Sequence, residues 1–105
     1  MQNVLADYKR MEQTARVLKV LAHPVRLCIV AGLMRTGECN VNKIQTCLDL
    51  PQSTVSQHLA RLREAGILVA TRVGVEVYYR VAEGDVTTLM RGLLPDGGGS
   101  APTGA

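Results

Sequence analysis

The chain has 105 residues, enough for one domain, and a formal net charge of +3. Hydrophobic residues make up 47% of it, with no Phe and no Trp, so the core must be aliphatic; this favours packed helices over an aromatic-rich β-sandwich. The mildly basic balance permits a polyanionic partner without requiring one. So small a domain has little interior, and a second chain could help to complete its core.

Three cysteines, Cys28, Cys39 and Cys47, are an odd number in a chain with ample aliphatic residues, which argues against a disulfide framework. Reduced thiols are the simpler interpretation and favour a cytoplasmic protein. Charges from Asp7 onward argue against a signal peptide, and the longest uncharged apolar run, residues 27–34, is too short to span a bilayer. No membrane partner is expected.

Helical periodicity covers the first half of the chain. Apolar residues at alternating spacings of four and three, from Val4 to Ala22, predict one helix. Pro24 suits the first turn of a second helix, which continues over residues 25–34. Because this segment is apolar around most of its circumference, we expect it to be the buried centre. A short third helix follows, over residues 41–48, with Asn40 as its N-cap.

A fourth helix is predicted from residue 51 to about residue 65, and its polar face carries the main functional signal. With Val55, Leu59 and Leu62 turned inward, hydroxyl and amide side chains lie on the outer surface. These groups can bind base edges and phosphates, and Gln can pair bidentately with adenine. The outward residues are Ser53, Ser56, Gln57 and Ala60, flanked by Gln52, Thr54 and Arg61. The first acid is Glu64, so the first two turns would not repel DNA.

After the fourth helix, the sequence pattern changes from helical spacing to one typical of β-strands. Residues 67–73 and 76–81 are β-rich and flank Gly74, which predicts a hairpin. A last short helix is expected over about residues 84–94, and residues 95–105 form a Gly-, Pro- and Ser-containing tail that we expect to be disordered. The fold is thus mainly α with a β-hairpin, a winged helix-turn-helix in the order α-α-α-α-β-β-α, with one domain over residues 1–94.

Three separated motifs carry a family resemblance: "LAHPVRLCIV", "LPQSTVSQHLARLREAGIL" and "RVGVEVYYRV". In this order they resemble the ArsR/SmtB (arsenic-repressor) family of bacterial winged-helix repressors, over roughly residues 17–94. The resemblance implies a homodimer that binds palindromic operator DNA and, in many members, an inducer that releases it. It implies a recognition helix carrying Gln52, Ser53, Thr54, Ser56, Gln57, His58 and Arg61, and a wing over residues 72–76. Many relatives carry a basic residue after the wing glycine where this chain has Val75, so Arg72 is the wing's candidate phosphate contact.

The resemblance also locates two metal-site types, and both look absent here. Aligned on Gly37, the usual Cys-x-Cys positions hold Asn40 and Asn42, and Asn is a poor ligand for soft metals. The second type uses Asp and His on the last helix, which has Asp85 but no His. No metal and no cofactor are therefore expected.

Any sensing within the chain would then depend on the thiols. We expect Cys28, on the second helix, to pack in the core as a small apolar side chain, and the same role is favoured for Cys47. Cys39 lies in a turn and is the first candidate for a redox-responsive thiol. Cys39 and Cys47 are eight residues apart, about 12 Å if helical, too far for a bridge within one subunit. His58 is expected at the edge of the inward face, in packing or in a phosphate contact.

Three other functions remain as alternatives. One is a winged-helix interaction module without DNA binding, which would need an exposed apolar patch on the fourth helix. Another is a repressor with no inducer of its own, all three cysteines being structural. An enzyme is the weakest, because the sequence offers no catalytic residues in a nucleophile–base pair, phosphate loop or paired carboxylates. The dimer would form through the first and last helices.

Overall fold

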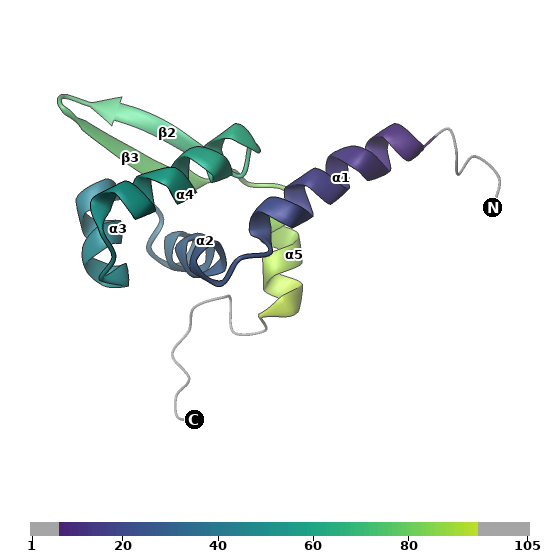
Figure 1. Cartoon of the computed structure of the whole chain (residues 1–105), viewed down its shortest axis with the longest axis horizontal. Helices are drawn as coiled ribbons and strands as arrows, with labels where there is room; N and C mark the ends of the chain where they lie inside the picture. Colours follow the sequence, from purple (N-terminus) through teal and green to yellow (C-terminus); the bar gives the residue numbers. More distant parts are fainter. Residues whose placement is uncertain (1–6, 95–105) are drawn as a thin grey trace.

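The computed structural model describes residues 7–94, and it is a winged helix-turn-helix (Figure 1). The elements in chain order are α1 (Tyr8–Leu21), α2 (Pro24–Thr36), β1 (Cys39–Asn40), α3 (Val41–Leu48), α4 (Gln52–Glu64), β2 (Leu68–Val73), β3 (Glu76–Val81) and α5 (Asp85–Leu93). The predicted order is confirmed, with β1 as an additional strand. The predicted start of the first helix at Val4 and the predicted tail, residues 95–105, lie outside the described residues.

Local chemistry sets the helix boundaries. His23 is the N-cap of α2: its backbone is extended, and its Nδ1 accepts a hydrogen bond from the backbone N–H of Val25. Pro24 then occupies the first helical position, as predicted. The side chain of Asn40 caps α3 by accepting from the N–H of Lys43 at 2.9 Å, which confirms its predicted role. Gly66, past the end of α4, has φ +77°, a conformation that favours glycine.

A small antiparallel sheet has the order β1-β3-β2. The hairpin of β2 and β3 was predicted; β1 was not, because a strand of two residues is too short to show a periodicity. In β1, Cys39 pairs with Tyr79 and Asn40 with Tyr78. The wing is therefore joined to the segment that leads directly into α3.

The core is aliphatic and lies among α2, α4 and the sheet. Val55, Leu59 and Leu62 are at most 1% exposed, so the predicted inward face of α4 is confirmed. The expectation for α2 is only partly correct: Ile29 and its neighbours in the core are buried, but Cys28 is exposed. A helix that is apolar around most of its circumference does not reveal from its sequence which side the neighbouring elements leave open.

No single helix among residues 7–94 is long and apolar enough to cross a membrane. Only α1 and α2 taken together reach that length and composition, and the two helices are bent by 92° at the break between them.

Candidate DNA-binding surface and thiol groove

The outer face of α4 carries the polar side chains that the sequence predicted there. Gln52, Ser53, Ser56, Gln57, Ala60 and Arg61 are exposed, and Thr54 is half-buried. The three inward residues fix the rotation of the helix, because each fills the core. The result is a helix that presents amides and hydroxyls along its length and the guanidinium groups of Arg61 and Arg63 in its last turn, with Glu64 as its only acid. Such a face has the donors and acceptors that base edges and phosphates require.

A tight turn sets α4 against α3. Asp49 ends α3 in the left-handed conformation, with φ +56°, and its N–H donates to the carbonyl of Gln45 at 2.8 Å. Pro51 then starts the next helix, where the carbonyl of Pro51 accepts from Val55 at 3.1 Å. The left-handed residue and the proline reverse the chain within three residues. The two helices pack together as the pair of a helix-turn-helix.

The wing projects beside this pair (Figure 1). Gly74 turns the hairpin with φ +65°, and Val75 at the tip is 93% exposed. Arg72 is exposed on β2. Glu76, the first residue of β3, accepts a hydrogen bond from Asn40 Nδ2 at 2.8 Å. A hydrogen bond with Glu76 also raises the pKa of the Tyr78 hydroxyl above its usual value. Glu76 thus links the tip end of the wing to the start of α3.

His58 lies between α4 and α2 rather than on the outer face. Its Nδ1 accepts from Arg26 Nε at 3.1 Å, and its ring meets that of His23 edge-on, with centroids 4.6 Å apart. Arg26 also donates to the carbonyl of Val20 at 3.2 Å. Partial burial, followed by the nearby His23 and Arg26, lowers the pKa of His58. Of the two predicted roles of His58, the structure shows packing; a phosphate contact stays a prediction.

Sequence reasoning missed Arg26 altogether. Arg26 lies 32 residues before its partner, His58. The one sequence feature that could have revealed it is the presence of a charged residue inside the apolar motif "LAHPVRLCIV". A partly buried cation on a mostly apolar helix needs a polar partner, which another element can supply.

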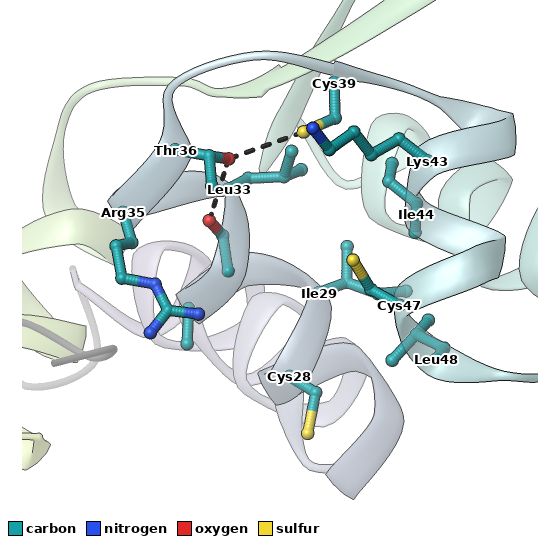
Figure 2. Close-up of a pocket in the computed structure, with 12 residues that line it drawn as sticks. Cys28, Ile29, Leu33, Arg35, Thr36, Cys39, Lys43, Ile44, Cys47 and Leu48 are labelled. Atoms are coloured by element: carbon teal, nitrogen blue, oxygen red, sulfur yellow. Dashed lines mark hydrogen bonds between the residues drawn. The ribbon is translucent and has the colours of Figure 1, made fainter. Parts of the chain in front are cut away.

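All three cysteines line one groove between α2 and α3, of about 400 Å³ (Figure 2). The predicted burial was wrong for two of them: Cys28 and Cys47 are exposed, and only Cys39 is half-buried. Both side chains line the groove at positions that α2 and α3 leave open to solvent. Apolar patterning could not separate these positions from core positions, because Cys counts as a small apolar residue in both.

Cys39 is held by Thr36. The Thr36 hydroxyl donates to the carbonyl of Gly32 at 3.0 Å, and Cys39 Sγ lies 3.4 Å from the same hydroxyl oxygen (Figure 2). Since the hydroxyl proton is engaged, the thiol is the donor to Thr36. Among residues 7–94 no group of three or more His, Cys, Asp or Glu side chains could hold a metal ion.

A helix-turn-helix domain model matches residues 21–71. The transcriptional repressor PagR of Bacillus anthracis is 42% identical over 89 residues, which cover 85% of this chain and 89% of PagR. Its crystal structure superposes with a TM-score of 0.75 and covers 82% of this chain and 98% of that chain. The repressor SmtB of Mycobacterium tuberculosis is 40% identical over 70% of this chain and 53% of its own. The chain belongs to the ArsR/SmtB family of winged helix-turn-helix transcriptional regulators.

This ArsR/SmtB membership confirms the resemblance and the predicted DNA-binding repressor class. The relatives described above are named as regulators of transcription, not as enzymes. A further relative, from Mycobacterium bovis, is described as a homodimeric winged helix-turn-helix DNA-binding domain. It is 35% identical, covers 86% of this chain and 84% of its own, and has a TM-score of 0.75.

Proposed function

We propose that this protein represses transcription as a homodimer, by binding a palindromic operator with α4 in the major groove and Arg72 of the wing on a phosphate. The exposed row of Ser53, Ser56 and Gln57 on α4 carries the proposal. These side chains lie on a helix whose opposite face is fully buried, so their orientation is fixed before any contact with DNA. Preorganised amides and hydroxyls favour direct readout of bases.

A dimer through α1 and α5 is supported by the apolar side chains that these helices leave in solvent. Tyr8 is 57% exposed and Met11 52% on α1, and Leu93 is 63% exposed on α5. Figure 1 shows both α1 and α5 at the end of the molecule opposite α3. A second copy would cover these side chains and leave α4 and the wing free, with two α4 helices to meet two half-sites.

The competing function, a protein-interaction module without DNA binding, receives little support. It would need an apolar patch on α4, yet Ala60 is the only apolar side chain on the exposed face of that helix. Selection from random-sequence duplexes, followed by gel shift at two salt concentrations, separates the two functions. A palindromic consensus with salt-dependent affinity supports the operator-binding function, and recovery of no enriched sequence contradicts it.

We also propose that the repressor responds to chemistry at its thiols, with Cys39 as the sensing residue. Cys39 lies in the groove, on the strand that joins the wing and α3, so a change at its Sγ reaches both DNA-contacting elements. Cys47 and Cys28 line the same groove and are the secondary candidates. The alternative is a repressor with no inducer of its own. Gel shifts with and without reductant distinguish them: equal operator affinity in both conditions would rule out an oxidisable thiol.

A further inference from the structure

We infer that the groove between α2 and α3 binds a small apolar electrophile, an α,β-unsaturated carbonyl compound, and that Cys39 adds to it covalently. This inference deepens the proposed thiol response by naming the class of inducer and its site. It rests on that proposed function only for its effect on DNA, because binding and addition can be measured without DNA.

The walls of the groove select an apolar compound. Ile29 and Leu33 of α2 face Ile44 and Leu48 of α3 across it (Figure 2). The volume of about 400 Å³ lies within the range of sites for small organic ligands. Ile29, Leu33 and Ile44 are at most 6% exposed and form the floor of the groove, so a ring or short chain in it would displace water from the more exposed apolar surface around them.

The charges of the groove select a compound that becomes negative as it reacts. Lys43 and Arg35 line the groove, and no carboxylate does. When a thiolate adds to a conjugated carbonyl compound, negative charge develops on the carbonyl oxygen. A cation beside that oxygen stabilises the transition state more than the neutral reactant. Lys43 is on α3, one turn before Cys47 and four residues after Cys39, and so lies between these two thiols in sequence.

The reaction needs no oxidant or other co-reactant. The thiol of Cys39 loses its proton to solvent, and the Sγ electron pair forms a bond to the β-carbon. The C=C π electron pair shifts to form a double bond between the α-carbon and the carbonyl carbon, and the carbonyl π electron pair moves onto the oxygen, which gives an enolate. Protonation from solvent completes a thioether adduct. The product contains all atoms of the thiol and the electrophile.

Cys39 is the best placed of the three thiols. Cys39 lies in β1, directly before the N-cap of α3, and lines the groove. Its contact with Thr36 holds Sγ in the groove. Cys47, in the last turn of α3, also lines the groove but is exposed to solvent. Figure 2 shows the sulfur of Cys28 pointing away from the other two.

An adduct at Cys39 would act on both elements that meet DNA. Cys39 pairs with Tyr79 of β3, and the next residue, Asn40, caps α3 and holds Glu76 of the wing. A ring wedged beside Ile44 would push α3 from α2, and α3 packs against α4. Displacement of α4 relative to the wing would weaken operator binding.

The test uses menadione, an apolar quinone, with iodoacetamide as the small polar comparison reagent. The full-length protein is treated with oxygen excluded, and peptide mass spectrometry gives the rate of modification at each cysteine. We expect the menadione rate at Cys39 to saturate with concentration, because binding precedes addition, and to exceed the rates at Cys28 and Cys47 by roughly tenfold. Iodoacetamide should react with all three thiols without saturation. Equal, unsaturated menadione rates at the three thiols overturn the inference.

Two variants separate groove binding from simple thiol reactivity. Lys43→Gln should slow menadione addition at Cys39 several-fold, whereas Lys9→Gln, on the exposed surface of α1, should not. If both variants react like the wild type, Lys43 has no role and the charge argument fails. Operator anisotropy of the adduct is a separate measurement. If addition at Cys39 is selective and saturable but DNA is not released, the binding site stands and only its coupling to repression is contradicted. If the unmodified protein never binds DNA, only the proposed function is contradicted.

Discussion

Arg26 on α2 donates a hydrogen bond of 3.1 Å to Nδ1 of His58 on α4, and so joins these two helices. The bond requires His58 to be neutral, with its proton on Nε2, because a protonated Nδ1 would meet the guanidinium as a second donor and a second positive charge. His23 lies against the same ring. The contact fixes the middle of α4, one residue from Gln57, to the corner between α1 and α2.

The first prediction is a loss of stability in acid. The pKa of His58 is lowered in the folded state from its usual 6.5, so the unfolded chain binds more protons near that pH. The contribution of neutral His58 to stability is therefore complete above about pH 6.5 and is lost as the pH falls through the lowered folded value. Denaturant unfolding from pH 8 to pH 5 should show a steeper loss in the wild type than in His58→Leu. Parallel pH profiles would contradict this.

The second prediction concerns base reading. Gln57→Ala should change the preferred base at one position of each half-site and cost roughly 1–3 kcal/mol of operator affinity. Arg72→Ala should instead weaken binding to every sequence about equally and reduce the salt slope by about one unit. Both residues are exposed, so neither change should alter folding. If Gln57→Ala leaves the selected consensus unchanged, Gln57 does not read a base.

The third prediction concerns the junction of wing and helix. Asn40→Ala removes the α3 cap and the contact with Glu76, and should lower the free energy of unfolding by about 1 kcal/mol or more. Asn42→Ala is the matched control, since Asn42 is exposed in the first turn of the same helix. Urea unfolding measures both. Equal stability of the two variants would show that the cap and the wing contact contribute nothing.

These residues also show what the sequence could and could not predict. The inward face of α4 was predictable because Val55, Leu59 and Leu62 are spaced by four and three, and helical geometry alone places them together. The Arg26–His58 bond was not, because its partners are far apart in sequence and meet only through the packing of two helices. The groove was not predictable for a related reason: periodicity shows that a helix has an apolar face, but not where its neighbour stops covering it.

The fourth prediction is dimerisation through the exposed apolar side chains of α1 and α5. Sedimentation at micromolar concentration should show a dimer, and Met11→Glu, which places a charge at the centre of the α1 patch, should shift it toward monomer. Lys9→Glu is the control, because its side chain lies off the apolar stripe of the same helix. Deletion of residues 95–105 should leave the dimer intact. A wild-type monomer at this concentration would contradict the proposed interface.

The last prediction concerns which chemical signal releases DNA. The family's thiolate positions hold Asn40 and Asn42, and the side chain of Asn40 is already engaged with Lys43 and Glu76. Binding a soft metal there would break the cap and supply no thiolate. We therefore expect Zn(II) and As(III) to leave operator affinity unchanged, while a thiol-reactive compound lowers it in the wild type but not in Cys39→Ser. Fluorescence anisotropy with the selected operator measures this under reductant, peroxide, polysulfide, either metal, or menadione. Unchanged operator affinity in every condition would contradict the proposed thiol response. Strong release of DNA by a metal alone would contradict the argument from Asn40 and Asn42.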